Sequence, residues 1–373
     1  MLVDISSYQY LPLLAVRYSE MVALENMPNK DKDILLPIIT LRSWANAHKL
    51  SSAIERVEKA FGKRPWIVDI DNQYYLEKRE LPDKEKKPVH RELESLKNPA
   101  DGYKNWCDFI EEHDQLIPCL QLEEVGEIDE QIDNLAVLDR GIAVRFNEEN
   151  IANWNAILGI LAQKSIDALY IIIDYGRTGQ RSQRDLLTYT ASVSSFVTSI
   201  VAVVPDATFI ISSTTFPTDF SDIDGLGSKD IYERQFFNMV ASQCRNISLI
   251  YSDRGSTRVE LAEGGWSGSP RIDYPLKDSW RISREKLSKQ DNKDGEERKA
   301  AFKRAAKAIV KDPSWEPALA VWGAKEIEAA SKTDHITNPR HSTAVRINIH
   351  LHRQLHYNAR PGAVIDTDDD WVD

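Results

Sequence analysis

The sequence predicts an α/β fold, a TIM-barrel-like (β/α)8 single domain with an insertion after the second strand and a C-terminal helical extension. Short runs rich in Ile, Val and Leu alternate with helical patterns, which is typical of βα units and a parallel sheet. The runs are apolar on both faces, as strands covered by helices on both sides require. Seven such runs, with room for an eighth, favour a barrel, because open sheets more often stop at about five or six strands.

The seven predicted strands follow one another along the first two thirds of the chain. They are Ile34–Leu41, Trp66–Asp71, Leu116–Glu123, Gly141–Phe146, Ala168–Asp174, Ala207–Ser213 and Ile247–Asp253. Helical patterns follow them at Trp44–Phe61, Tyr103–Glu112, Glu127–Leu138, Ile151–Gln163, Arg184–Val203 and Ile231–Gln243. The eighth strand has two candidates, Ser269–Tyr274 and Trp280–Ser283.

The predicted barrel occupies residues 1–340. The segment at about 72–102 contains a Lys- and Glu-rich stretch, Glu77–Glu94, with two prolines. It is expected to be a solvated or partly disordered insertion between the second strand and its helix. Two helical patterns, Ala300–Val310 and Ala318–Ala330, follow the strands. Residues 341–373 form a basic, His-rich segment and an acidic tail, and the spacing over Ser342–His352 favours a helix over a strand.

Composition limits the classes of function. The 47 Lys and Arg against 58 Asp and Glu give a net charge of −11, which argues against a chain-wide nucleic-acid footprint. No apolar run reaches the roughly 18 residues of a membrane span, and the first ten residues lack a signal peptide's basic start. The 3 cysteines have no C-x-x-C spacing, so reduced thiols in a cytoplasmic protein are expected.

Charged side chains stand at or near the ends of the predicted strands, where barrels place their catalytic groups. They are Asp69, Glu123, Arg145, Asp174 and Asp253. Converging carboxylates repel one another, so a cation or the arginines must neutralise them. They could bind a divalent cation such as Mg²⁺, with Asp69 and Asp174 as the best ligands, or supply the acid and base of phosphodiester or glycoside cleavage. The alternative is ordinary loop capping and pairing with arginine.

A second set of charged residues could bind phosphate. Arg177 lies in a loop with two glycines, and Arg271, Asp273 and Arg281 lie near the predicted eighth strand, where barrels often hold phosphate. A flexible loop and a surface ion-pair set are the alternatives.

The late segment carries candidate nucleic-acid contacts. Arg346, His352 and Arg353 make it locally basic; the alternatives are a docking face for the acidic remainder of the chain or a plain exposed face. His352 and His356 share a helix face, but no acidic residue lies between them, so the spacing does not support zinc.

Several short pieces, in order along nearly the whole chain, resemble the phage-type beta protein family. They are Tyr10–Glu20, Leu35–Ile39, Ile172–Asp174, Ile211–Ser213, Arg271–Tyr274, Trp280–Ser283 and Asn348–His352. The resemblance implies a protein of phages and bacterial genomes, often encoded near mobile or defence genes, and it brings no catalytic residues. The hypothesis it favours is a recognition module in a phage–host conflict, with a protein partner encoded nearby. A metal-dependent, phosphodiesterase-like hydrolase and a nucleic-acid binder are the alternatives.

Overall fold

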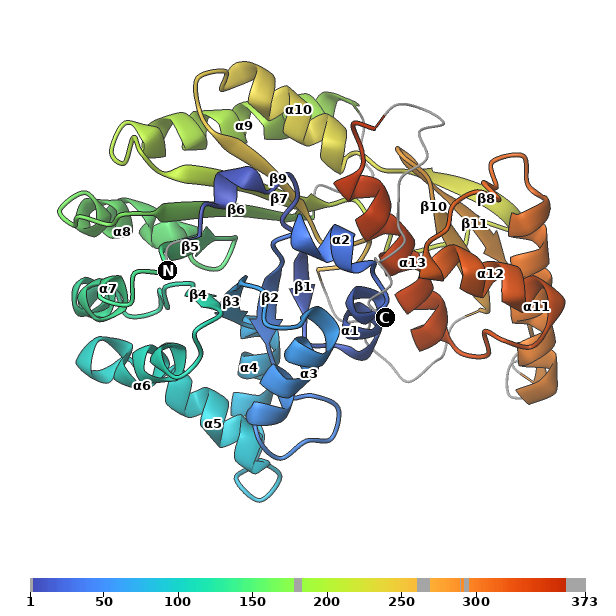
Figure 1. Cartoon of the computed structure of the whole chain (residues 1–373), viewed down its shortest axis with the longest axis horizontal. Coiled ribbons are helices and arrows are strands. Elements are labelled where there is room, and N and C mark those ends of the chain that lie inside the picture. Colours follow the sequence, from blue (N-terminus) through green and yellow to red (C-terminus); the bar gives the residue numbers. More distant parts are fainter. Residues whose placement is uncertain (1–2, 178–182, 260–268, 289, 292–294, 360–373) are drawn as a thin grey trace, which may run out of the picture. The chain divides into compact units, whose positions relative to one another are not determined.

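The computed structural model describes residues 3–177, 183–259, 269–288, 290–291 and 295–359, which group into two compact units (Figure 1). Unit 1 comprises Met1–Arg17, Ile34–Ser213 and Glu233–Arg254. Unit 2 comprises Tyr18–Asp33, Thr214–Tyr232 and Gly255–Asp373. Each unit is therefore assembled from segments that are far apart in the sequence.

Unit 1 contains two four-stranded parallel sheets. The first has the order β1 (Leu13–Ala15), β2 (Ile38–Leu41), β3 (Trp66–Ile70), β4 (Leu116–Pro118). The second has the order β5 (Ile142–Phe146), β6 (Leu169–Arg177), β7 (Thr208–Thr214), β9 (Leu249–Asp253). Isolated parallel bridges join Cys119 to Ala143 and Tyr10 to Tyr251.

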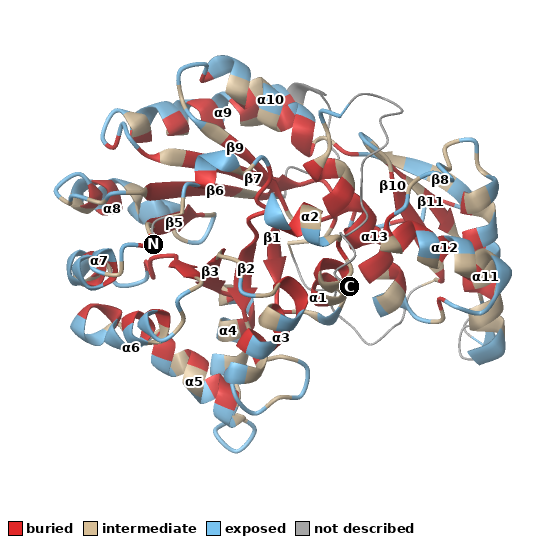
Figure 2. Cartoon of the chain, viewed as in Figure 1, coloured by how far each residue is buried: buried red, intermediate tan, exposed pale blue. Residues whose placement is uncertain are grey.

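The strands of unit 1 form because both of their faces are buried. Side chains alternate across a strand, and one set, which includes Ile67, Ile117, Ile172, Ile210 and Ile250, forms a single apolar cluster. The opposite set packs under the helices that surround the strands (Figures 1 and 2). These helices are α3 (Ser51–Phe61), α4 (Asn72–Arg79), α5 (Pro88–Leu96), α6 (Ala100–Glu111), α7 (Ile128–Ala136), α8 (Trp154–Leu161), α9 (Gln183–Val201) and α10 (Glu233–Gln243).

Unit 2 is an antiparallel sheet with helices. The sheet has the order β10 (Arg271–Pro275), β11 (Ser279–Arg284), β8 (Gly225–Asp230). Its helices are α1 (Tyr18–Glu25), α2 (Asn29–Asp33), α11 (Gly295–Lys311), α12 (Trp322–Lys332) and α13 (Pro339–Leu355). Ile272 and Tyr274 of β10 pack in one apolar cluster with residues of α11, α12 and α13, whereas Trp280 and Ile282 of β11 pack with Phe216 and Phe220.

The structure confirms the alternation of helices with parallel strands, and it corrects the expected eighth strand. Ser269–Tyr274 and Trp280–Ser283 were the candidates, but they lie in the antiparallel strands β10 and β11 of unit 2. The additional parallel strand is β1, only 3 residues long, which pairs with β2. A strand this short carries too little alternation to stand out in a sequence. A closed barrel and a boundary at residue 340 stay predictions.

The charged stretch at about 72–102 is mostly helical, and its assignment as a solvated insertion stays a prediction. Asp71 caps α4 by accepting a hydrogen bond from the Tyr74 amide at 3.0 Å. Pro88 begins α5, and Val89, Leu93 and Leu96 are buried along one face of it. The charged residues dominated the composition and hid this apolar stripe. In the described part of the chain, no helix combines the length and apolarity of a membrane span.

Candidate functional site at the carboxyl edge of unit 1

A buried chain of alternating charges lies at the carboxyl ends of the unit 1 strands. Arg145, near the end of β5, contacts Asp69 of β3 at 2.7 Å and Asp174 of β6 at 3.3 Å. Arg254, directly after β9, contacts the same oxygen of Asp174 at 2.6 Å. Two guanidinium groups thus neutralise two carboxylates. Converging carboxylates require either a bound cation or arginines, and here arginines are present.

Alternation along the strands places these side chains on the face of the central apolar cluster. Asp69, Arg145 and Asp174 each follow a cluster residue by two positions, namely Ile67, Ala143 and Ile172. The same spacing places Ser212 after Ile210 and Ser252 after Ile250. The interior therefore changes from apolar to polar toward the carboxyl edge.

Some polar atoms of this layer have no protein partner. Ser212 Oγ, Ser252 Oγ and Arg145 Nε are buried and make no hydrogen bond within the described residues. Burial opposes the charge of Arg145, but Asp69 and Asp174 outweigh it and raise the pKa of the guanidinium above its ordinary value. Arg145 is therefore charged at every working pH and holds both acids.

Asp69 and Arg145 also line a pocket of about 270 Å³. The other polar residues of this pocket are Asn72, Lys97, Gln121, Glu123, Asn147, Glu149, Asn150 and Asn153. Lys97, at the end of α5, donates a hydrogen bond to Gln121 Oε1 at 2.9 Å and pairs with Glu123. The lining offers both hydrogen-bond donors and acceptors, so it suits a ligand group rich in polar atoms.

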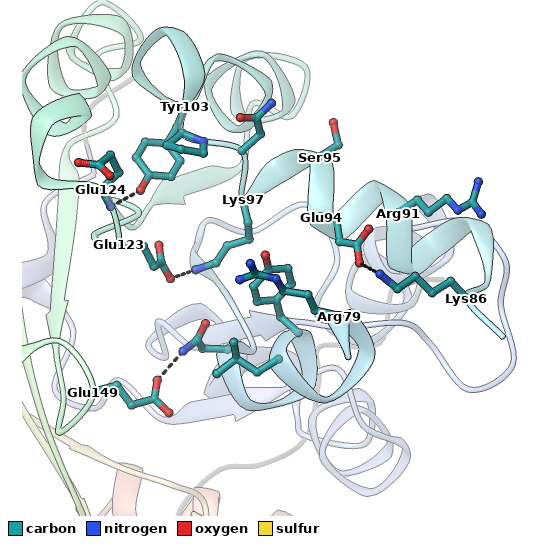
Figure 3. A pocket seen from close by; sticks show the side chains of 15 residues that line it. Arg79, Lys86, Arg91, Glu94, Ser95, Lys97, Tyr103, Glu123, Glu124 and Glu149 are labelled. Atoms are coloured by element: carbon teal, nitrogen blue, oxygen red, sulfur yellow. Dashed lines mark hydrogen bonds and ion pairs between the residues drawn. The ribbon is translucent and has the colours of Figure 1, made fainter. Parts of the chain in front are cut away.

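A larger depression of about 1060 Å³ shares Asn72, Lys97, Glu123 and Glu149 with this pocket (Figure 3). Its rim comes from α4, α5 and the start of α6. Figure 3 shows the Lys97 side chain directed at Glu123. It also shows the ion pair between Glu94 of α5 and Lys86, which precedes that helix; their charged atoms lie 2.6 Å apart. Arg79 and Arg91 add two exposed cations.

The rim has a left-handed turn. Asp101, Gly102 and Tyr103 all have positive φ, between 55° and 64°. A Cβ atom on Gly102 would lie 2.7 Å from Glu130 Cγ, so the close approach of α7 requires glycine there. The turn holds the Tyr103 hydroxyl 2.7 Å from the Glu124 amide, which donates to it, and burial raises the pKa of this tyrosine.

Of the other two predicted catalytic residues, Asp253 lies on another face and Glu123 lines the same pocket as Asp69. Asp253 follows Ser252 and therefore points to the opposite face, where it accepts hydrogen bonds from the Tyr10 and Tyr251 hydroxyls, each at 2.6 Å. Glu123 is exposed at the pocket. The structure brings together Asp69, Arg145 and Asp174, and their catalytic and metal-binding roles stay predictions.

The predicted phosphate-binding residues do not form one cluster. Arg271 contacts Asp273 at 2.6 Å, whereas Arg281 contacts Asp312 at 2.7 Å, all within unit 2. The Arg177 side chain lies outside the described residues. Carboxylates hold Arg271 and Arg281, as the ion-pair alternative expects.

The predicted nucleic-acid residues lie on α13, and most of that helix is buried. Arg346 binds Asp273 at 2.7 Å, and His352 binds Asp31 at 2.7 Å. Arg353 contacts Glu316 at 3.2 Å and donates to the Tyr274 hydroxyl at 2.9 Å. The expectation of a plain exposed face is wrong for Arg346 and His352, because the segment packs inside unit 2. A nucleic-acid role stays a prediction.

Sequence reasoning missed Lys97 and the amides of the pocket. Asn147, Asn150 and Asn153 come from the loop after β5 and the turn that follows it. Loop amides show no periodicity, so the only signal was their density: 4 asparagines between residues 147 and 155.

A protein-family model and a curated protein each match this chain over nearly its full length. The family model described as "Beta protein" matches residues 10–356. The chain belongs to the beta protein family. "Protein beta" of Enterobacteria phage P4 is 26% identical to this beta protein over 369 residues, which cover 95% of each chain. The family resemblance predicted from the sequence is thereby confirmed.

Proposed function

We propose that this beta protein is a cytoplasmic recognition protein in a phage–host conflict, and that it binds a protein partner encoded nearby. The observation that carries the proposal is the open depression bounded by α4, α5 and α6, with Arg79, Arg91 and Lys97 on its rim and floor. Side chains of both signs suit a partner segment with polar and charged groups, because complementary charge provides specificity. Similarity to a phage protein supports the setting.

The scaffold of this site is, in our proposal, a closed eight-stranded barrel. Its support is the two isolated bridges, which lie where the edge strands of the two sheets meet. The Leu120 amide donates to the Ala143 carbonyl at 2.9 Å, and the Leu11 amide donates to the Tyr251 carbonyl at 3.0 Å. Hydrogen exchange tests closure: in a barrel both amides exchange as slowly as those within the ladders, and fast exchange at either one contradicts closure.

Pairwise binding to the products of neighbouring genes tests the recognition proposal. Arg91→Glu reverses an exposed charge at the depression, and we expect it to weaken binding at least tenfold. Arg245→Glu is the matched control, because Arg245 is exposed on the segment after α10 and lines neither described pocket. Equal affinities of the two variants, or no binding by any neighbouring product, contradict the proposal.

The second candidate is a metal-dependent, phosphodiesterase-like hydrolase. The observation that favours it is the exposure of Asp69 to the 270 Å³ pocket, beside Arg145 and the buried Asp174. An aryl phosphodiester assayed with Mg²⁺ and Mn²⁺ tests it. A hydrolase loses its activity in Asp69→Asn and Asp174→Asn while circular dichroism shows that both variants are folded. Absent wild-type activity, or activity retained in the folded variants, excludes this candidate and leaves the recognition proposal standing.

A further inference from the structure

Unit 2 contains a buried carboxylate held between two histidines, and the proposed function makes no use of it. Asp31 of α2 is 1% exposed. Its Oδ2 atom lies 2.7 Å from Nδ1 of His352, and its Oδ1 atom lies 2.8 Å from Nε2 of His356. His352 is in the last turn of α13, and His356 is its C-cap.

We propose that Asp31, His352 and His356 bind a divalent transition-metal ion. Their ligand atoms all lie within 4.8 Å of one another. A tetrahedral zinc site with bonds of about 2.0–2.1 Å has its ligand atoms about 3.3 Å apart. Shifts of roughly half an ångström, within the reach of small side-chain rotations, convert the observed contacts into that geometry.

The donor set selects the type of metal. One oxygen of Asp31 and one nitrogen of each histidine provide three ligand atoms, and a water molecule would complete a four-coordinate site. Imidazole nitrogen suits Zn²⁺, Co²⁺ and Ni²⁺, whereas Mg²⁺ and Ca²⁺ prefer sites made of oxygen. The site is therefore expected to discriminate against Mg²⁺ and Ca²⁺.

The fold prepares the site from two distant parts of the sequence. His352 and His356 lie four residues apart and so face the same side of the helix end. The carboxyl end of a helix carries partial negative charge, which favours a cation there. Asn348, one turn earlier, donates to the carbonyls of Ala23 and Asn26 at 3.0 and 3.2 Å, which fixes α13 against the segment that carries Asp31.

A second histidine–carboxylate cluster in unit 2 provides the comparison. Glu326 uses a single oxygen, Oε2, to contact both His335 at 2.7 Å and His341 at 2.6 Å. The His335 side chain is 42% exposed. With one oxygen shared and one histidine in solvent, this cluster is the weaker candidate, and its variants serve as controls.

Cobalt titration of the full chain, after chelator treatment, tests the proposal. We expect one equivalent of Co²⁺ to produce the intense visible absorption of a four-coordinate ion, and Zn²⁺ to displace it and raise the melting temperature. His352→Gln and His356→Gln each remove the absorption and the thermal shift, whereas His341→Gln keeps both. The His356 side chain is 19% exposed, so His356→Gln should fold, and circular dichroism checks this.

Each outcome of the cobalt titration either supports or overturns the metal site at Asp31, His352 and His356. Absorption lost in both variants and kept in His341→Gln supports the site. No absorption in the wild type, or absorption that persists in folded His356→Gln, overturns it. Absorption lost only in His341→Gln assigns the metal to the Glu326 cluster and also overturns it. None of these results bears on partner binding, because the depression tested above lies in unit 1.

Discussion

Both units bury aspartate between arginines, but only the unit 1 network contributes to the two pockets described above. In unit 1, Asp69 and Arg145 line the 270 Å³ pocket. In unit 2, Asp273 lies between Arg271 and Arg346, and aromatic rings cover both guanidinium groups. Phe220 lies 3.5 Å from Arg271, and Phe216 lies 4.0 Å from Arg346. The same ion-pair chemistry therefore serves a candidate site in one unit and packing in the other.

The difference shows that buried charge alone does not mark a functional site. Removing charges from water carries a large desolvation penalty, which good geometry only offsets. In unit 2, cation–π contacts add to that compensation. In unit 1, unpartnered polar atoms remain beside the charges, including Ser212 Oγ and Ser252 Oγ among the residues described. Arg346 Nε in unit 2 also lacks a hydrogen bond within the described residues, so access to a described pocket, and not unsatisfied polar atoms, distinguishes the two networks.

The largest expected effect is that of Arg145→Met. This change leaves two buried carboxylates without their shared cation, so we expect it to lower the free energy of unfolding of unit 1 by about 3–5 kcal/mol. Hydrogen exchange in β3, β5 and β6 measures this locally. The double variant Asp69→Asn/Arg145→Met should recover part of the loss, because it removes one unpaired charge. A loss below about 1 kcal/mol in the single variant would mean that pocket water already solvates both acids.

Arg346→Met should have a smaller effect in unit 2. Asp273 keeps Arg271 as its partner, so the loss is that of one charged hydrogen bond, about 1.5–3 kcal/mol. Exchange of the β10 and β11 amides measures it. If Arg346→Met lowers the free energy of unfolding more than Arg145→Met does, the aromatic rings over the arginine, and not the number of its ion-pair partners, determine the size of the loss.

Acid should weaken unit 2 through Asp273 and Asp31. Burial alone raises the pKa of Asp273, but Arg271 and Arg346 outweigh it and lower the pKa below its ordinary value; His352 and His356 do the same for Asp31. A lowered pKa in the folded state adds stability that is present above about pH 4 and is lost as the pH falls through the folded value. In thermal melts across this range, the melting temperature of Asp273→Asn should fall less steeply with decreasing pH than that of the wild type. An unchanged slope would refute the role of Asp273.

The smallest expected effect lies at the rim of the unit 1 depression. Asp71→Ala removes the cap of α4 and should destabilise that helix by about 1 kcal/mol. Asp71→Asn retains a capping side chain and loses the ion pairs with Arg42, at 3.2 Å, and with Arg17, at 3.7 Å, so it should destabilise α4 less. Exchange of the α4 amides compares the two variants, and equal effects would show that the ion pairs, not the cap, stabilise the helix.

The sequence predicted much of the candidate site, because parallel strands place their carboxyl ends at one edge of a sheet. Asp69, Arg145 and Asp174 each end an apolar run, and they do meet. Asp253 ends such a run too, but it is one position out of phase with Ile250, so it faces the other way. The prediction for Asp253 was wrong because it used the position of the strand end and not the face of the strand on which each side chain lies.

The sequence by itself determined the alternation of helices with parallel strands, the strand-end charges and the family, because these depend on local apolar patterns and on ordered short matches. Only the tertiary structure decided the pairing of β1 with β2, the antiparallel sheet of unit 2 and the meeting of Asp31 with His352 and His356. Asp31 and His352 are 321 positions apart in the chain. No periodicity connects residues at that separation; the packing of α13 against the segment from α1 to α2 brings them together.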